Sequence, residues 1–256
     1  MPNKFKLLHR GCAALALVAA LLASNPGFAA ETLKVCVDAD NPPFSSESKG
    51  GIDVDIARAL AAGLQRELAL QWVRVPERGG LGKALKQSIQ AGQCDIFMGL
   101  PLEAEMTREL AERKLATSRT YMTVGYVSVS LRAGGSGSKI GAVTATPADL
   151  YLHRQQTADR QPYASNRDLI EALRAGKLKR ALVWSPALAE HLAASNDNVL
   201  EIDAAQPTDP SLRFGLLAVV RSGGTVSLAD IDRVLAELAG AGKLAEIAAA
   251  HALPAL

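Results

Sequence analysis

The chain has 256 residues, of which 48% are hydrophobic, and a formal net charge of +2 at pH 7. This length suffices for one large domain or for two smaller lobes, each with its own core. Acidic and basic residues are interspersed and nearly balanced, which excludes a surface built to follow nucleic-acid phosphates or anionic membranes.

Residues 1–29 are predicted to be a secretory signal peptide. Lys4, Lys6 and Arg10 give a positive start, the apolar run that follows is too short to cross a bilayer, and small residues stand at the positions that a signal peptidase reads. Cys12 precedes the apolar run, so we expect no lipoprotein membrane anchor. The mature protein is therefore expected in the periplasm, with 25 basic residues against 26 acidic ones.

Residues 33–44 (LKVCVDADNPPF) predict a strand that ends in a rigid loop. Apolar side chains alternate over 33–37, the period of a strand, and the Pro-Pro pair then stops it. The loop holds Asn41 and Phe44 at the carboxyl end of the strand, where ligands bind in open α/β sheets. Phe44 is either one wall of a binding cleft or a side chain packed beneath its own loop.

Strand and helix patterns then alternate. Residues 51–64 predict a helix with one apolar face, and Asp53 and Asp55 lie in its first turn, where the helix dipole favours them. We interpret them as helix-start residues, because the glycine and terminal glutamate of a calcium loop are missing. A strand at 68–75, a helix at 83–91 closed by Gly92, and a strand at 95–99 with the apolar middle of a parallel sheet follow.

Cys36 and Cys94 are the two cysteines of the mature chain. In an oxidising compartment an even pair forms a disulfide most simply, and two buried free thiols are the alternative. A disulfide here would tie the first strand to the start of the third.

Residues 99–102 leave the third strand at the same edge as Phe44. Gly99 and Leu100 are therefore candidates for the second wall of the cleft. Residues 103–114 predict a helix. The long alternating run at 121–131 suits a connecting strand that leaves one lobe and enters another.

The strand and helix pattern restarts after a flexible turn at 133–138. Thr146 and Pro147 begin a predicted helix, and the backbone N–H groups after Thr144 and Thr146 are candidates to hold an anionic group. Trp184 is either a ligand-stacking residue opposite Phe44 or a core residue, and Ser185 follows it. The remaining predicted elements of this lobe are strands at 140–143, 181–184 and 199–202 and helices at 166–175 and 186–194.

The last part of the chain predicts a return to the first lobe. Residues 213–220 read as a second connecting strand, and two alanine-rich helices follow at 228–239 and 244–250. The expected fold class is α/β with two lobes and two hinge strands, and a cleft between such lobes closes on a ligand by hinge motion. The expected boundaries are 30–124 for lobe 1, 125–212 for lobe 2, and 213–256 for the return to lobe 1.

The sequence favours a binding protein over an enzyme. His153, His191 and His251 are far apart and form no metal-binding spacing, and no nucleophile elbow, phosphate loop or dinucleotide fingerprint occurs. We therefore expect no catalytic residue, metal or cofactor. Arg78 and Arg119 are possible charge partners for a ligand, although solvated surface positions are their ordinary role.

Two stretches resemble a known family. GIDVDIARAL at 51–60 and AGQCDIFMG at 91–99 are similar to the family 3 bacterial extracellular solute-binding proteins, and the resemblance covers essentially the whole mature chain. It implies the type II periplasmic-binding fold, a small polar solute as ligand, and an ABC permease for amino acids or other polar solutes as partner.

Four further stretches resemble one subgroup of that family, the accessory proteins encoded beside periplasmic PQQ-dependent methanol and alcohol dehydrogenases (methanol-oxidation protein J type). This resemblance implies a periplasmic quinoprotein dehydrogenase or its cytochrome c as partner. An ABC-transporter receptor and, more remotely, a hydrolase or lyase on the same scaffold remain alternatives. The stretches are CVDADNPPFS (36–45), VPERGGLGKALKQSIQAGQCD (75–95), TSRTYMTVGYVSV (117–129) and ALVWSPALAEHLA (181–193).

The chain departs from the amino-acid binders at the positions that hold a zwitterion. Those proteins bind the ligand carboxylate with a Ser/Thr pair and an arginine after the third strand. Here Pro101 stands where a hydroxyl is expected, and Arg108 is the displaced arginine. The acidic residue that meets the ligand ammonium is replaced by Trp184 and Ser185. Ordinary α-amino acids are therefore not expected as ligands, because an unpaired ammonium in a closed cleft is costly.

Overall fold

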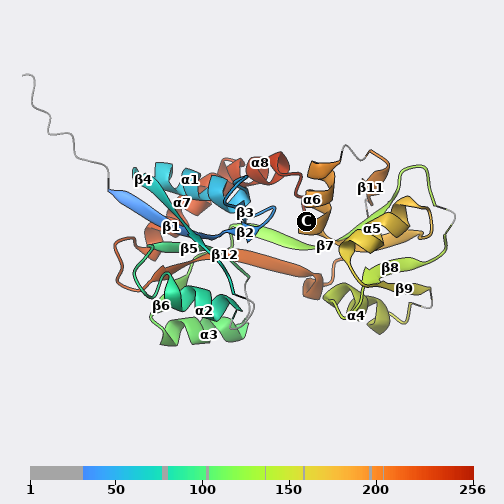
Figure 1. Cartoon of the computed structure of the whole chain (residues 1–256), viewed down its shortest axis with the longest axis horizontal. Coiled ribbons are helices and arrows are strands. Elements are labelled where there is room, and N and C mark those ends of the chain that lie inside the picture. Colours follow the sequence, from blue (N-terminus) through green and yellow to red (C-terminus); the bar gives the residue numbers. More distant parts are fainter. Residues whose placement is uncertain are drawn as a thin grey trace, which may run out of the picture. The chain divides into compact units, whose positions relative to one another are not determined.

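The computed structural model describes residues 31–76, 80–101, 104–135, 137–157, 159–195, 198–203 and 205–256. The expected signal peptide, Arg78 and the Leu102 end of the expected second wall lie outside these residues. Glu31–Leu256 form one compact unit. Within it, helices and strands form the two-lobe type II periplasmic-binding fold that the sequence predicts (Figure 1).

The first lobe is built on a mixed sheet with helices on both faces. Its elements are β1 (Thr32–Asp38), β2 (Asp40–Asn41), β3 (Ser45–Ser46), α1 (Ile52–Gly63), β4 (Glu67–Val73), α2 (Gly80–Gln87), β5 (Ile96–Pro101), α3 (Ala104–Glu112) and β6 (Leu115–Thr117). Helix α2 is shorter than the predicted 83–91, and turns lead from it to Gly92, whose φ is +77°.

The third predicted strand does not lie in a purely parallel sheet. β5 pairs in parallel with β1 but antiparallel with β12 (Arg213–Arg221), which returns from the far end of the sequence. β5 is nevertheless buried on both faces, as predicted, because helices cover this sheet on each side (Figure 1). This burial explains the apolar middle of the strand.

Two strands connect the lobes. β7 (Met122–Leu131) and β12 pair with each other over the first four residues of each, and β7 then continues into the second lobe (Figure 1). The sheet order is β4-β1-β5-β12-β7-β10-β8-β9, with β11 on β7 and β6 on β12. Both predicted connecting strands are therefore present.

The second lobe repeats the alternation of strand and helix. Four described strands were not predicted: the two-residue strands β2 and β3, the three-residue β6, and β9, whose sequence RQPY contains a proline. The elements of this lobe are β8 (Ile140–Val143), α4 (Pro147–Arg154), β9 (Arg160–Tyr163), α5 (Asn166–Arg174), β10 (Arg180–Trp184), α6 (Ser185–Ala194), β11 (Leu200–Ile202) and the 3-10 turn η1 (Pro210–Leu212).

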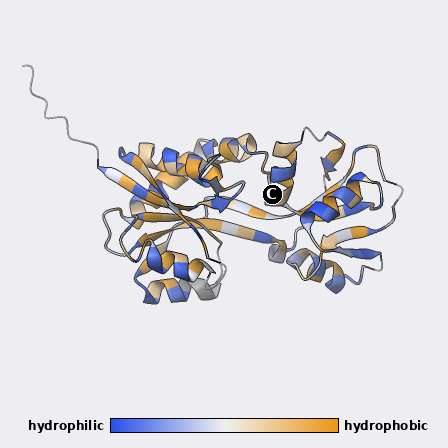
Figure 2. Ribbon diagram, in the orientation of Figure 1, coloured by the Kyte–Doolittle hydropathy of each residue, from blue (hydrophilic) through white to orange (hydrophobic). Residues whose placement is uncertain are grey.

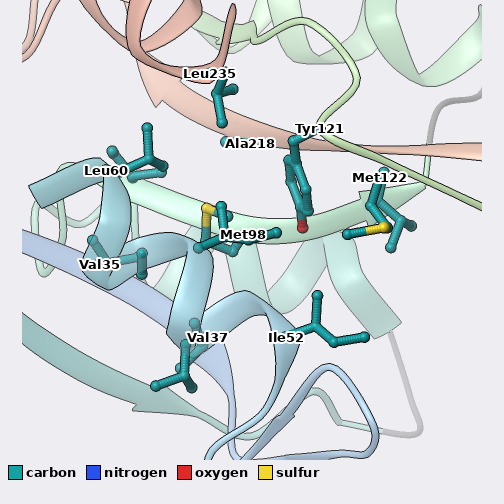
Figure 3. Close-up of a cluster of buried hydrophobic side chains, with 14 of the residues drawn as sticks. Val35, Val37, Ile52, Leu60, Met98, Tyr121, Met122, Ala218 and Leu235 are labelled. Atoms are coloured by element: carbon teal, nitrogen blue, oxygen red, sulfur yellow. The ribbon is translucent and has the colours of Figure 1, made fainter. Parts of the chain in front are cut away.

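Helices α7 (Leu228–Gly240) and α8 (Lys243–Ala250) follow β12 and pack against α1. Their apolar residues join the largest core cluster, which also contains strand residues such as Val35 and Met98 (Figure 3). Hydrophobic residues line the strands and the helix faces turned toward them, whereas outer helix faces are hydrophilic (Figure 2). Among the described residues, no helix is long and apolar enough to cross a membrane.

Cys36 and Cys94 form a disulfide, with 5.7 Å between their Cα atoms. Both side chains are buried in a second core cluster on the other face of the first sheet, between the strands and α2. The prediction of a bond rather than two free thiols is confirmed, and the bond joins the middle of β1 to the residues just before β5.

Candidate functional site

A cavity of about 420 Å³ lies where the two lobes meet, and its volume falls within the range typical of small-molecule sites. Both connecting strands, the Asn41–Phe44 loop and the amino ends of second-lobe helices contribute side chains to it. The lining residues are Asn41, Phe44, Gly99, Pro101, Val124, Tyr126, Pro147, Asn166, Trp184, Phe214 and Leu216.

The apolar wall of this pocket follows from strand geometry. Val124 and Tyr126 are two residues apart on β7 and so share one face, as do Phe214 and Leu216 on β12. Register places Phe214 beside Val124 and Trp184 of β10 beside Tyr126. The three strands therefore present one continuous aromatic and aliphatic surface.

The aromatic rings of this surface contact one another. The centroids of Tyr126 and Trp184 are 5.2 Å apart at 51°, and those of Trp184 and Phe214 are 5.6 Å apart at 70°. These tilted and edge-to-face arrangements are the favoured ones for aromatic pairs. Trp184 is partly buried against both lobes' cores and also lines the pocket, and its predicted role in stacking on a ligand stays a prediction.

Phe44 also has both of the roles that the sequence left open. Its side chain is only 7% exposed and belongs to the main core cluster, yet it lines the pocket. The backbone of its loop is held by α1, because Asp53 N donates a hydrogen bond to Phe44 O at 2.8 Å. Asn41, at the loop's start, is exposed and contributes an amide to the same wall.

Gly99 and Leu100 go to opposite sides of the sheet. β5 has one residue more than β12 between the pairs Phe97–Val219 and Leu100–Leu217, a β-bulge that includes Gly99 at φ +84°. Gly99 consequently lines the pocket, whereas the Leu100 side chain is buried in the cluster that holds the disulfide. Leu100 therefore does not line the pocket, contrary to its predicted place in the cleft wall.

A buried carboxyl group lies directly behind Gly99. Tyr121 donates a hydrogen bond from its phenol to Asp53 Oδ1 at 2.6 Å, and Gly99 N donates to the same phenol oxygen at 2.9 Å. Burial raises the pKa of Asp53 from 3.8 to about 7, and the hydrogen bond from Tyr121 opposes this rise. Burial, together with the neighbouring Asp53, also raises the pKa of Tyr121, so this phenol keeps its proton.

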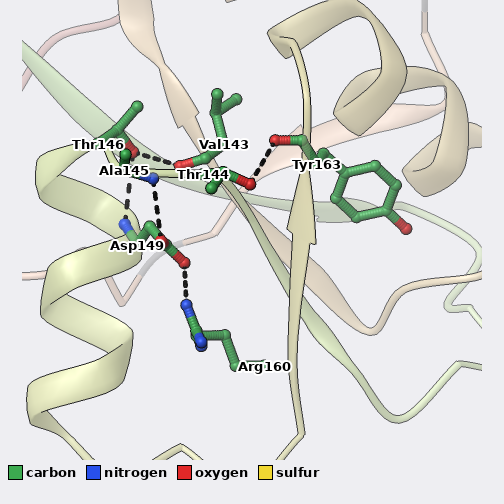
Figure 4. Close-up of polar contacts among 7 residues, drawn as sticks. All are labelled: Val143, Thr144, Ala145, Thr146, Asp149, Arg160 and Tyr163. Atoms are coloured by element: carbon green, nitrogen blue, oxygen red, sulfur yellow. Dashed lines mark hydrogen bonds and ion pairs between the residues drawn. The ribbon is translucent and has the colours of Figure 1, made fainter.

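The start of α4 is organised by its own side chains (Figure 4). Thr146 caps the helix, with its hydroxyl donating to Val143 O at 2.7 Å and accepting from Asp149 N at 3.4 Å. Asp149 accepts a hydrogen bond from Ala145 N at 3.0 Å and pairs with Arg160. Thr146 thus positions Pro147 at the pocket rather than lining it itself.

The other predicted site residues lie outside the pocket lining. Thr144 is exposed and donates to Tyr163 O at 3.1 Å, and the Ser185 hydroxyl is fully buried and accepts from Gly125 N at 3.1 Å. Arg108 is exposed on α3. Arg119 is exposed, and its backbone N–H donates to Asp232 at 2.7 Å.

The described residues that line the pocket carry no acidic or basic side chain. Their hydrogen-bonding side-chain groups are the amides of Asn41 and Asn166, the phenol of Tyr126 and the indole N–H of Trp184. Burial raises the pKa of Tyr126, so its hydroxyl stays neutral. No cluster of three or more histidine, cysteine or acidic residues occurs within the described ranges. The site can therefore bind by packing and hydrogen bonds.

A family model matches residues 33–253, described as bacterial extracellular solute-binding proteins, family 3. The chain belongs to this family. The match spans both lobes and both connecting strands. The search of curated proteins found no match.

Solved structures share the fold at low sequence identity. The second substrate-binding domain of a putative amino acid ABC transporter from Streptococcus pneumoniae has a TM-score of 0.67 and 17% identity, covering 87% of this chain and 100% of that one. The L-cystine solute receptor of Neisseria gonorrhoeae has a TM-score of 0.67 and 18% identity, and the match covers 86% of this chain and 91% of that one. MxaJ from Methlophaga aminisulfidivorans MPT has a TM-score of 0.58 and 20% identity, and the match covers 88% of this chain and 100% of that one.

Much of the pocket wall was missed by the sequence reasoning. The strands at 121–131 and 213–220 were interpreted as connectors only, although a connector between lobes necessarily turns one face toward the cleft. The alternating aromatic and aliphatic residues of that face were the available signal. Pro101 belongs to the predicted second wall at 99–102, and the missed residues are Val124, Tyr126, Pro147, Asn166, Phe214 and Leu216.

Proposed function

We propose that this family 3 protein is a periplasmic solute receptor that serves a PQQ-dependent alcohol or methanol dehydrogenase system. In this proposal residues 1–29 are a cleaved signal peptide, and the mature chain holds a small solute between its lobes. The extracellular family, the Cys36–Cys94 disulfide and the lack of a membrane-spanning helix among the described residues support a secreted location.

One observation carries the proposal: among the described residues, the pocket lining has the shape of a receptor site but not the charges of an amino-acid site. A zwitterion brings one carboxylate and one ammonium into the closed cleft, and each would lose its water without gaining a counter-charge from the lining residues. We therefore place this protein apart from the amino-acid receptors that share its fold.

The dehydrogenase system is favoured by the four sequence stretches that resemble the accessory subgroup. Three of these stretches supply pocket residues, since 36–45 contains Asn41 and Phe44, 117–129 contains Val124 and Tyr126, and 181–193 contains Trp184. The fold likeness to MxaJ agrees with this assignment at the level of architecture.

We further propose that the lobes move about the boundaries 124/125 and 212/213. These two points are neighbours in space, because Gly125 of β7 pairs with Arg213 of β12. A side chain at Gly125 would collide with Leu212 O, so the glycine allows the close approach of the two connecting strands. Lobe 1 would then consist of 30–124 with 213–256, and lobe 2 of 125–212.

Co-purification tests the proposed partner. The tagged mature protein is expected to retain a quinoprotein dehydrogenase or its cytochrome c from a periplasmic extract of its own host grown on an alcohol. A purified pair should also bind in a titration. Retention of neither protein, with tight binding of a free amino acid, would overturn the proposal.

A receptor for an ABC transporter is the second candidate, favoured by the family match. It predicts that the liganded protein stimulates the ATPase of a permease complex reconstituted from the same host. A ligand at a hundred times its Kd would also stabilise the protein by about 2.7 kcal/mol in a thermal-shift screen. A screen of amino acids, polyamines and organic acids without any shift would count against this candidate.

A further inference from the structure

We propose that the ligand of the interlobe pocket is a flat, uncharged molecule whose edge carries carbonyl or amide groups. This inference rests on the proposed function, since it assumes that the pocket holds a ligand, and it narrows the class of that ligand. It follows from the aromatic rings that line the pocket, from the polar groups among them, and from the position of the Asp53 carboxyl group behind the pocket wall.

The rings offer faces and edges to a planar molecule. Trp184 stands between Tyr126 and Phe214, with centroids 5.2 Å and 5.6 Å away, and Phe44 enters the lining from the other lobe. Stacked and edge-on contacts between planar groups are favourable beyond the area that they bury. A saturated ring of equal size fills the same volume without these contacts.

The polar groups of the lining suit neutral acceptors and donors. Asn41 comes from the first lobe and Asn166 from the second, so one ligand can bridge both. Asn166 Oδ1 lies 3.5 Å from Trp184 N, which leaves its amide N–H groups directed elsewhere. Primary amide groups pair equally well with carbonyl and amide edges, and they neutralise no charge.

The buried carboxyl group of Asp53 lies behind the pocket wall at Gly99. Asp53 Oδ2 would lie 2.7 Å from a Cβ at Gly99, which is a lining residue. When ionised, this group would repel a ligand carboxylate, and no lysine or arginine of the described lining offsets that. When protonated, it offers a ligand ammonium no counter-charge, and when ionised it lies behind Gly99 with Oδ1 hydrogen-bonded to Tyr121, so it is not an exposed partner for an ammonium. A neutral ligand avoids both costs.

A matched set of probes tests the inference: 2-naphthamide, 2-naphthoate, 2-naphthylmethylammonium, L-tryptophan and decahydro-2-naphthamide, each titrated at pH 7 by calorimetry. We expect 2-naphthamide to bind at least tenfold more tightly than the three charged probes and at least threefold more tightly than the saturated amide. The chain has two tryptophans, Trp72 and Trp184, so a ¹⁵N spectrum shows two indole N–H signals. Only the Trp184 signal should shift.

Variants locate the binding. Trp184→Leu and, in case that variant fails to fold, Phe214→Leu are expected to weaken 2-naphthamide at least fivefold. Trp72→Phe is the control, because Trp72 lies on β4 and not in the pocket lining; it also assigns the two indole signals. Its affinity should equal that of the unmodified protein.

Each other outcome overturns the inference. A charged probe that binds as tightly as the amide, with the Trp184 signal shifted, would refute the uncharged class while leaving the pocket as a binding site. Equal binding of the saturated amide would refute the flat shape. No binding by any probe would refute the ligand class, and co-purification with a dehydrogenase, which does not depend on these probes, would still decide the proposed partner.

Discussion

Tyr121 donates a hydrogen bond to Asp53 at 2.6 Å, joining a residue just before β7 to the first turn of α1 across 68 positions of sequence. Tyr121 is 4% exposed and Asp53 is 2% exposed, so the pair is shielded from water. Because Gly99 N donates to the same phenol, this contact links α1, β5 and the start of a connecting strand. The ionisation of Asp53 is therefore linked, through Tyr121, to the position of Gly99 in the pocket lining.

The stability of the protein should depend on pH through Asp53. Its folded pKa, about 7, exceeds the ordinary 3.8 expected on unfolding, so the folded state keeps a proton that the unfolded state releases. The free energy of unfolding should therefore fall as pH rises from about 4 to 7, by at most about 1.4 kcal/mol per pH unit, and level off above 7.

Asp53→Asn isolates this effect, since the amide keeps a carbonyl acceptor for Tyr121. Urea unfolding of both proteins from pH 4 to 8 should show the variant gaining stability relative to the unmodified protein as pH rises. The exposed Asp159→Asn serves as control and should show no such gain. A pH-independent difference between Asp53→Asn and the unmodified protein would mean that Asp53 ionises at its ordinary pH.

Gly99→Ala should destabilise the protein more than Gly176→Ala, the same substitution at another glycine with a positive φ. An added Cβ would lie 2.7 Å from Asp53 Oδ2, and the φ of +84° is unfavourable for alanine. Gly176 has φ +70° but open space around it, so Gly176→Ala carries the backbone cost alone, about 1 kcal/mol. Urea unfolding should give a loss of at least about 2 kcal/mol for Gly99→Ala. Equal losses for the two variants would show that Asp53 moves away from the added Cβ at little cost.

Removal of the disulfide should lower stability substantially. The bond closes a loop with a sequence separation of 58, for which the chain-entropy model gives about 4 kcal/mol. The Cys36→Ala/Cys94→Ala variant should therefore unfold at lower urea concentration than the oxidised protein. Reductant should move the unmodified protein toward the variant and leave the variant itself unchanged. Two free thiols in the unfolded protein without reductant would contradict the bond.

The ion pair between Asp149 and Arg160 should matter more than a surface pair. The Asp149 side chain is 9% exposed, and Arg160→Met would leave its carboxylate buried with one charged partner fewer. We expect a loss of about 1–3 kcal/mol in urea unfolding. Arg132→Met breaks the pair with Glu201, whose side chains are 66% and 44% exposed, and should cost under about 1 kcal/mol. If Arg160→Met and Arg132→Met cost similar amounts, the hydrogen bond from Ala145 N would suffice to stabilise the buried Asp149 carboxylate.

Periodicity was sufficient to predict most of the fold. The alternation at 33–37, the four-residue spacing at 51–64 and the capped start at Thr146 correspond to β1, α1 and α4. These elements bury a clear apolar face, so local pattern and tertiary structure agree. β9 was missed because Pro162 argues against a strand; it is tolerated there because β9 is the last strand of the sheet order.

The pocket was predicted less completely than the fold. Asn41, Phe44, Gly99 and Trp184 were expected near one another and do line one cavity, because strands β1, β5 and β10 lead toward the gap between the lobes. The position of Leu100 depends on a bulge, which an uninterrupted alternation cannot reveal. Tyr126 and Phe214 lie within strands, and which face of a connecting strand meets the cleft depends on pairing register rather than on local sequence.

Strand β12 completes the first sheet from the last fifth of the polypeptide, in the position between β5 and β7. Until Arg221 has left the ribosome, β5 and β7 each lack a hydrogen-bonding partner along one edge, and the first lobe cannot complete its sheet. Folding of the first lobe must therefore wait for nearly the whole chain. Truncation before Arg213 should accordingly yield an aggregating product rather than a shortened receptor.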